Sequence, residues 1–262
     1  MRVVIKIGTS TIAHSTGQLN IRRVELLCKT LADLKNAGHE VLVVSSGAIG
    51  MGVGKLHLTR RPDDIPTRQA AAAVGQCEMM YIYDSLFSKY NHTVGQILLT
   101  AEDIYHETRQ QNLEATLFRL LELGAIPIIN ENDSVATAEI EGGEIGDNDT
   151  LSAHVAVFAK ADLLVLLTDI DGLYTADPKK KKGAQLIPVV TDITGELLSL
   201  AGGAGSGLAT GGMKTKLMAA QILQQHGIDM VITNGQCPEC LYDIVEGRQT
   251  GTRFSFSKGG HV

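Results

Sequence analysis

Apolar runs alternate with polar stretches along the whole chain, and four of these runs end abruptly in small, hydroxyl-bearing or carboxylate-bearing residues. The four runs are Val3–Ile7, Val41–Val44, Ile126–Ile129 and Leu163–Leu167. Continuous apolar runs of this length are typical of strands in a parallel sheet that is covered on both faces. The polar residues that follow the runs would then gather at one edge of the sheet, where open α/β proteins bind their ligands.

Segments between these runs predict helices that cover the sheet. Ile21–Ala37 has apolar residues at spacings of three and four and is followed by Gly38, a typical helix stop. Further helices are predicted at Thr67–Tyr90, Leu113–Leu123, Thr150–Ala159 and Lys216–Gln225, and further strands at Thr93–Leu99 and Met230–Thr233. This alternation predicts an α/β fold, a three-layer αβα sandwich around a mainly parallel open sheet.

The length and composition favour a single domain. The chain has 262 residues, of which 44% are hydrophobic, and this is enough to bury a full core. Length alone would allow two domains, but no repeat and no long linker divides the pattern. We therefore predict one domain over residues 1–256, with residues 257–262 as a tail.

The charge pattern argues against nucleic-acid and membrane partners. The net charge is −6 and the pI is near 5.7, whereas binding to phosphate backbones needs a concentrated basic face. The dense basic run Lys179–Lys182 follows a turn-like Asp177-Pro178 pair, which favours a solvated loop over a phosphate contact. No run approaches the roughly 20 apolar residues of a membrane span.

Four cysteines, Cys28, Cys77, Cys237 and Cys240, are too few for a disulfide framework in a chain of this length. With no export segment at the N-terminus, we expect a reducing, cytoplasmic compartment. Cys237 and Cys240 have the spacing of half a zinc site, but the other two cysteines lie far apart and supply no second half. The interpretation that we favour for this pair is a structural turn, and we assign no metal to protein ligands.

Two lysines beside glycines are the first candidates for anion binding. Lys6 lies inside the first apolar run, where a buried ammonium group needs an anion; an exposed face of an edge strand is the alternative. Lys216 follows the glycine-rich segment Ala201–Gly212, just where a helical pattern begins. Glycines, a helix N-terminus and a lysine together have the properties of a phosphate cradle, and a merely flexible loop is the alternative. The Walker A order and the loops of the protein-kinase fold are absent.

Carboxylates and amides gather in two clusters, Asn130–Asp133 and Gly146–Asp149. Carboxylates this close repel one another unless they bind cations or ammonium groups, or are fixed at helix N-termini. For Asp149 the alternative role is a cap on the helix that starts near Thr150. Between the clusters, Ala138–Ile145 alternates about a Gly-Gly pair and predicts a β-hairpin. It is either a lid over the site or a loop without a role in it, and the flanking Asp133 and Asp147 favour the lid.

Ser45–Gly47 closes a strand with two hydroxyl groups and a turn, which suits a carboxylate ligand. No histidine or cysteine near these clusters has a partner that would indicate nucleophilic catalysis. Cations, glycine loops and carboxylates without a nucleophile indicate phosphoryl transfer by positioning and charge neutralisation.

Six segments, in this order, resemble the amino-acid kinase family and, within it, the branch of glutamate 5-kinases. They are Lys6–Ser10, Ser45–Ile49, Asn130–Glu139, Gly146–Asp149, Thr168–Asp169 with Gly172–Pro178, and Thr210–Lys216. The resemblance spans Val3 to about Phe254. It implies the fold of that family and the ATP-dependent phosphorylation of the γ-carboxylate of L-glutamate, the entry step of proline biosynthesis, with Mg²⁺ accompanying the nucleotide.

The resemblance also implies roles for single residues. Lys6 and Lys216 would hold the phosphates and the transferred group, and Asp149 would orient the two lysines. L-glutamate would be bound by Ser46, Gly47, Asp133 and Asn148. ATP would be bound by Lys6, Gly8, Thr168, Asp169, Tyr174, Asp177, Thr210, Gly211, Gly212, Met213, Lys214, Thr215 and Lys216. The segment Glu139–Glu144 has no match residue by residue and is assigned no ligand contact.

A homo-oligomer and feedback inhibition by proline are further implications of the resemblance. Many members carry a C-terminal PUA domain, which we expect to be absent here because the chain stops at Val262. Rival substrates in the family are acetylglutamate, aspartate, carbamate and UMP; carboxylates around the expected ammonium position favour a free amino acid. A non-catalytic sensor on the same scaffold is a rival of another class, against which the joint presence of Lys6, Lys216 and Asp149 argues.

Overall fold

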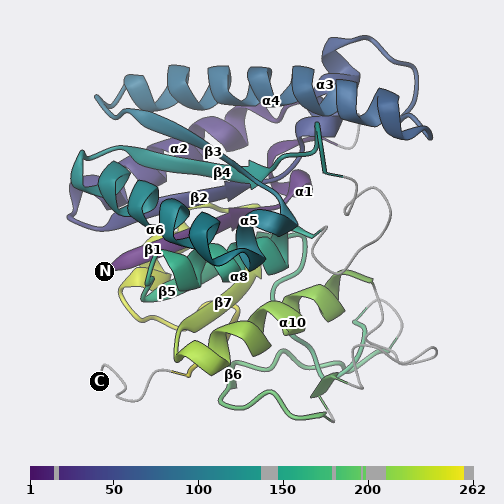
Figure 1. The fold of residues 1–262 in the computed structure, drawn as a ribbon. Coiled ribbons are helices and arrows are strands. Elements are labelled where there is room, and N and C mark those ends of the chain that lie inside the picture. Colours follow the sequence, from purple (N-terminus) through teal and green to yellow (C-terminus); the bar gives the residue numbers. More distant parts are fainter. Residues whose placement is uncertain (15–17, 137–146, 179–180, 196, 199–210, 257–262) are drawn as a thin grey trace.

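The computed structural model describes residues 1–14, 18–136, 147–178, 181–195, 197–198 and 211–256. Within these residues, a sheet with the strand order β3-β4-β2-β1-β5-β7-β8-β6 forms the middle layer (Figure 1). Its strands are β1 (Arg2–Ile7), β2 (Glu40–Ser45), β3 (Val94–Leu99), β4 (Ile126–Glu131), β5 (Leu163–Thr168), β6 (Val189–Val190), β7 (Asp229–Asn234) and β8 (Thr252–Phe254). Neighbouring strands are parallel except β7 and β8, which are antiparallel.

Helices cover both faces of the sheet (Figure 1). They are α1 (Thr9–Ile12), α2 (Ile21–Asn36), α3 (Ala48–Lys55), α4 (Ile65–Ser88), α5 (Ala101–Tyr105), α6 (Glu107–Glu122), α8 (Asn148–Phe158), α10 (Gly211–His226) and α11 (Cys240–Val245). One core cluster joins α2, α4 and α11 to the sheet, and a second joins α5, α6, α8 and α10 to the opposite face. The predicted three-layer αβα sandwich is therefore confirmed.

The alternation of side chains along β1 decides which face Lys6 occupies. Val3, Ile5 and Ile7 belong to the core cluster under α2 and α4, while Val4 belongs to the cluster under α8 and α10. Because successive side chains of a strand point to opposite faces, Lys6 lies on the same face as Val4. β1 pairs with β2 on one side and with β5 on the other, so the alternative of an edge strand for Lys6 is wrong.

The predicted strands and long helices are all present, with shifts at their ends. Helix α6 begins at Glu107 and α10 at Gly211, each several residues before the predicted start, because their first turns are polar or glycine-rich and give no apolar periodicity. The short helices α1, α5 and α11 and the strands β6 and β8 were not predicted, since each is too short for a clear pattern.

Helix α3 was also not predicted, because its sequence carries glycines at 50, 52 and 54, which disfavour helix locally. Tertiary packing against α4 overrides this preference. A Cβ atom on Gly52 would lie 1.7 Å from the carbonyl oxygen of Ala71, and one on Gly75 would lie 1.8 Å from that of Ala48. The two backbones thus touch at glycines where no side chain fits.

The remaining predictions concern the cysteines, metal and membrane segments, and the basic run with its neighbouring loops. Cys237 lies in the turn before α11, Cys240 is the first residue of that helix, and all four cysteines are free. Among the described residues, no group of three or more histidine, cysteine or acidic side chains could hold a metal ion. No helix in that part of the chain is long and apolar enough to cross a membrane. Lys181 and Lys182 are exposed, while Lys179, Lys180, the predicted hairpin and most of the glycine-rich segment lie outside the described residues.

Candidate active site

Asp149 joins two lysines that come from opposite ends of the chain. Its Oδ1 atom lies 2.8 Å from Nζ of Lys6, and its Oδ2 atom lies 2.9 Å from Nζ of Lys216. Lys6 and Lys216 are each 7% exposed and Asp149 is 1% exposed. Ion pairs buried to this extent are screened by salt much less than surface pairs. The three side chains therefore form one charged cluster inside the protein.

Three elements build this cluster. β1 supplies Lys6, the first turn of α8 supplies Asp149, and α10 supplies Lys216. Thr215 Oγ1 also donates to Asp149 Oδ2 over 3.0 Å, and Lys216 Nζ donates to the carbonyl oxygen of Gly212 over 3.1 Å. The N-terminus of α10 is thus fastened to the N-terminus of α8.

The interpretation of Asp149 as a helix cap is wrong. Helix α8 is capped by Asp147, whose Oδ1 atom accepts a hydrogen bond from the backbone N–H of Asp149 over 3.3 Å. Asp149 lies within the first turn instead, and its carboxylate is turned toward the two ammonium groups.

The two ammonium groups also govern the ionisation of Asp149. Burial alone would raise the pKa of this carboxyl group, but the charges of Lys6 and Lys216 and their hydrogen bonds outweigh it and hold the pKa below the usual value. Asp149 is therefore ionised at neutral pH. Two positive charges and one negative charge leave the cluster with one net positive charge.

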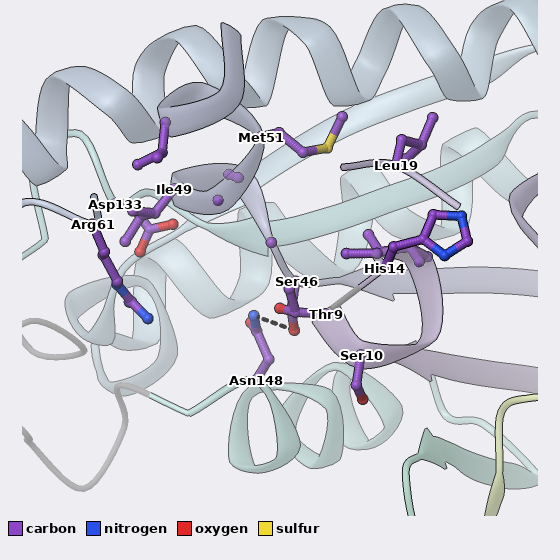
Figure 2. A pocket seen from close by; sticks show the side chains of 16 residues that line it. Thr9, Ser10, His14, Leu19, Ser46, Ile49, Met51, Arg61, Asp133 and Asn148 are labelled. Atoms are coloured by element: carbon purple, nitrogen blue, oxygen red, sulfur yellow. Dashed lines mark hydrogen bonds between the residues drawn. The ribbon is translucent and has the colours of Figure 1, made fainter. Parts of the chain in front are cut away.

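A pocket of about 590 Å³ lies beside this cluster, at the carboxyl ends of β1 and β2 (Figure 2). Its lining includes all four residues that the sequence assigned to the substrate, namely Ser46, Gly47, Asp133 and Asn148. Asn148 Nδ2 donates to Ser46 Oγ over 2.8 Å, the dashed line of Figure 2. A Cβ atom on Gly8 would lie 3.8 Å from both Lys6 Nζ and Ser10 Oγ, so the Lys6 ammonium group lies near the Ser10 side of the pocket.

Backbone conformation explains why Ser46 reaches the pocket and Ser45 does not. Gly47, at the start of α3, has φ of 103°, a value that favours glycine and turns the chain sharply from strand to helix. Ser45 is fully buried, and its hydroxyl group shares a 2.8 Å hydrogen bond with that of Tyr83. Of the two serines predicted to receive a carboxylate, Ser45 is therefore a structural residue of β2.

A chain of buried amides orients Asn148. Its Nδ2 atom donates to Asn130 Oδ1 over 3.3 Å, and Asn130 Nδ2 donates to Gln76 Oε1 over 3.0 Å. These bonds tie α8 to β4 and α4 across the end of the sheet. Sequence reasoning missed Gln76, because a single glutamine in an alanine-rich helix gives no functional signal.

Sequence reasoning also missed several lining residues of the pocket. Thr9 lies in the segment Lys6–Ser10 and directly follows a strand, so its position after β1 could have indicated it. His14, Met51 and Arg61 also line the pocket, but they lie in stretches that carry no recognisable pattern.

Four of the residues predicted to bind the nucleotide, Thr168, Asp169, Tyr174 and Asp177, lie at the carboxyl end of β5 and on the loop after it. Thr168 ends β5 and donates to Asp169 Oδ1 over 3.2 Å. The hydroxyl group of Tyr174 donates to Asp171 over 3.0 Å, and partial burial together with this bond raises the pKa of Tyr174. Asp171 in turn accepts a hydrogen bond from Asn234 at the end of β7 over 2.8 Å, and Asp177 is buried.

Lys6 on β1 and Gly8 directly after it are also among the predicted nucleotide residues, and a further six form the start of α10. Gly211 to Lys216 lie in its first two turns; Met213 is buried, while Gly212 and Lys214 are exposed. Thr215 and Lys216 reach Asp149, as described above. Thr210 lies outside the described residues.

Comparison with known proteins identifies the family of this chain. A sequence model of the amino acid kinase family matches residues 1–234. The chain belongs to the amino acid kinase family. Within the family, its relatives place it among the glutamate 5-kinases: it is 47% identical to the glutamate 5-kinase of Clostridium perfringens over 98% of this chain and 96% of that one. The identity to the glutamate 5-kinase of Clostridium tetani is 50%, over 98% and 95% of the two chains.

Solved structures of other kinases share the fold. A carbamate kinase from Giardia lamblia, solved bound to AMP-PNP, superimposes with a TM-score of 0.68 at 16% identity, covering 97% of this chain and 98% of that one. A UMP kinase from Bacillus anthracis superimposes with a TM-score of 0.63 at 16% identity, covering 97% and 95%. At this identity the likeness concerns the fold, and it confirms the predicted architecture.

Proposed function

We propose that this protein is a kinase that transfers a phosphoryl group from ATP to the γ-carboxylate of L-glutamate, forming L-glutamyl 5-phosphate in the first step of proline biosynthesis. The observation that carries the proposal is the meeting of Lys6 and Lys216 at Asp149, directly beside a pocket lined by Ser46, Asp133 and Asn148. The choice of glutamate rests on the glutamate 5-kinases that are 47–51% identical to this chain.

The chemistry of this transfer suits a site without a general base. The acceptor carboxylate has a pKa of about 4.3 and is already ionised at neutral pH. The difficulty is that two anions must approach each other. Lys6 and Lys216 counter this repulsion and stabilise the charge that develops during transfer, while Asp149 keeps both ammonium groups in place.

The pocket residues would position glutamate as follows. Asp133 would pair with the ammonium group of the substrate. Because Ser46 Oγ accepts a hydrogen bond from Asn148, its own hydroxyl hydrogen is available to the γ-carboxylate. Gly47 precedes the first turn of α3, whose backbone N–H groups favour an anion.

ATP supplies the phosphoryl group, and Mg²⁺ accompanies its phosphates. The residues proposed to hold the nucleotide are Lys6, Gly8, Thr168, Asp169, Tyr174, Asp177, Thr210, Gly211, Gly212, Met213, Lys214, Thr215 and Lys216. A phosphate group fits at Gly212: within the described part of the chain, and apart from the helix's own backbone, a Cβ atom there would have one neighbour within 4 Å, Nζ of Lys216 at 3.6 Å. The AMP-PNP bound to the carbamate kinase of the same fold supports this use of ATP.

Trapping with hydroxylamine tests the proposal. The purified protein is incubated with ATP, Mg²⁺ and glutamate, and both the release of ADP and the formation of the hydroxamate are measured. We expect both to depend on glutamate, with much lower rates for acetylglutamate, aspartate, carbamate and UMP. If the protein binds glutamate but releases no ADP, it is a sensor and not a kinase. If another acceptor is phosphorylated faster than glutamate, that acceptor is the substrate.

We propose further that proline inhibits by competing for the same pocket, since it offers a carboxylate and an ammonium group to the same side chains. Support comes from the resemblance to the family. Initial rates at increasing proline are expected to show a higher apparent KM for glutamate. A rate that stays flat across millimolar proline would contradict this.

We also propose a cytoplasmic homo-oligomer with one catalytic domain over residues 1–256. Four free cysteines support a reducing compartment, and one sheet running from β1 to β8 supports the single domain. Exposed apolar side chains such as Tyr81 on α4 and Leu123 after α6 are candidates for subunit contacts. Sedimentation velocity that finds only a monomer at micromolar concentration would contradict the assembly.

A further inference from the structure

Arg61 brings a guanidinium group to the substrate pocket. It lies in the loop between α3 and α4, residues 56–64, and lines the pocket. Figure 2 shows its side chain on the same side of the pocket as Asp133, while Ser10 and His14 lie on the other side. The pocket therefore holds a positive and a negative side chain together, away from the end where Ser10 approaches Lys6.

The loop around Arg61 is fixed by its neighbours. Arg68 donates from Nε to the carbonyl oxygen of Pro62 over 2.8 Å. The ion pair of Arg60 with Asp63, at 3.6 Å, joins side chains that are 83% and 81% exposed, so it contributes little to holding the loop. Asp64 caps α4 by accepting from the backbone N–H of Thr67 over 2.8 Å. Within the described residues, Arg61 has neither an ion pair nor a hydrogen bond. It is a cation on an anchored loop whose guanidinium group is available to a ligand.

A substrate with two carboxylates needs such a group. Glutamate carries one carboxylate at each end, so the ammonium groups of Lys6 and Lys216 alone would attract either one. The α-carbon bears an ammonium and a carboxylate group side by side, and it requires an anion and a cation placed together. Asp133 and Arg61 meet this requirement on one side of the pocket.

We propose that Arg61 binds the α-carboxylate of the amino-acid substrate and thereby directs the γ-carboxylate toward Lys6. The planar guanidinium fork matches a carboxylate with two parallel hydrogen bonds, which an ammonium group cannot provide. This inference rests on the proposed function and deepens it, because it restricts the substrate to amino acids with a free α-carboxylate.

The test compares two substrates in two matched variants. L-glutamate is compared with its α-carboxamide, which keeps the ammonium group and the γ-carboxylate but loses the charge that Arg61 would bind. Arg61→Gln is compared with Arg60→Gln, because Arg60 is the adjacent arginine and does not line the pocket. We expect Arg61→Gln to raise the KM for glutamate about 10- to 100-fold, the loss of a charged hydrogen-bonded pair.

The KM for the α-carboxamide should stay unchanged in Arg61→Gln, kcat should be largely retained, and Arg60→Gln should match the wild type. Arg61→Lys keeps the positive charge but loses the guanidinium fork, so its KM for glutamate should lie between those of the wild type and Arg61→Gln. Equal effects on both substrates, or no effect on either, would overturn the inference. Thermal melting of each variant separates loss of binding from loss of folding.

Calorimetric titration with glutamate keeps the two proposals distinguishable. If the wild type fails to phosphorylate glutamate, the proposed function fails. Glutamate binding that is weakened in Arg61→Gln and intact in Arg60→Gln would still support the role of Arg61. Equal binding by both variants would overturn that role, whatever the result for turnover.

Discussion

Among the single residues, one cluster both stabilises the fold and carries a net positive charge. It consists of Lys6, Asp149 and Lys216. Each ammonium group contacts a separate oxygen of Asp149. A buried charge is costly unless it is paired, and here both ammonium groups share one carboxylate. One positive charge remains uncompensated by the cluster, and an anionic ligand is its natural partner.

Removing either lysine should depress turnover far more than stability. In Lys6→Ala or Lys216→Ala, Asp149 keeps one ammonium partner, so folding is largely preserved. The transferring group loses half of its stabilising charge, and we expect glutamate-dependent ADP release to fall about 10²- to 10³-fold. Lys29→Ala, an exposed lysine on α2, is the control and should match the wild type. Wild-type rates in either lysine variant would contradict the proposed mechanism.

Asp149 should contribute stability that depends on pH in one direction. Its folded pKa lies below the ordinary value of 3.8, despite the opposing effect of burial, because of Lys6 and Lys216. As pH falls, the unfolded chain takes up the proton first, so the contribution is full above about pH 4 to 5 and is lost progressively below.

Urea unfolding of the wild type and of Asp149→Asn measures this contribution. Between pH 5 and pH 7 we expect the variant to be less stable by about 3–5 kcal/mol, as for a broken buried ion pair. The difference should shrink as the pH is lowered toward 3.5. A difference that grows toward acid would show that the folded pKa is raised instead.

At the scale of elements, the sequence predicted the central strands and long helices because their apolar patterns persist over many residues. Helix α3 was not predicted because the contacts that stabilise it come from another element, α4. Its three glycines oppose helix formation locally, and the backbone contact with Ala71 and Gly75 of α4 explains one of them, Gly52. Ser46 and Gly47 lie just before α3, so the same contact also sets the position of the pocket wall.

Gly75→Ala should therefore destabilise the protein strongly. The new Cβ atom would lie 1.8 Å from the backbone oxygen of Ala48, and the helices would have to separate. We expect a loss of about 3 kcal/mol in the free energy of unfolding, typical of overpacking against a rigid backbone. Gly54→Ala is the matched control on α3, because nothing lies within 4 Å of its Cβ position. It should be neutral or stabilising by up to about 1 kcal/mol.

Urea denaturation of the two variants in parallel measures both effects. If Gly75→Ala unfolds at the same urea concentration as the wild type, the close approach of α3 and α4 is not a constraint on the fold.

At the scale of the whole molecule, the site is assembled from elements that are far apart in sequence. Binding of glutamate should therefore stabilise the entire fold. At 100 times its Kd, a ligand stabilises by about 2.7 kcal/mol, which for a chain of this size corresponds to roughly 5–10 °C in Tm. Acetylglutamate lacks the ammonium group that Asp133 is proposed to bind, so it should cause a much smaller shift. Equal shifts in a thermal melt would contradict that role of Asp133.

The amino-acid sequence predicted the alternation of strands and helices, the edge of the sheet that carries the polar clusters, and four substrate candidates, Ser46, Gly47, Asp133 and Asn148, which all line one pocket. The first two features follow from local periodicity and from the residues that end each strand, whereas the four candidates follow from the resemblance to the family. Packing in three dimensions places Asp147 as the cap of α8 and Asp149 between two lysines, buries Ser45 and brings Arg61 to the pocket. The direction of a side chain depends on which elements pack against it, and that information is not contained in any single stretch of chain.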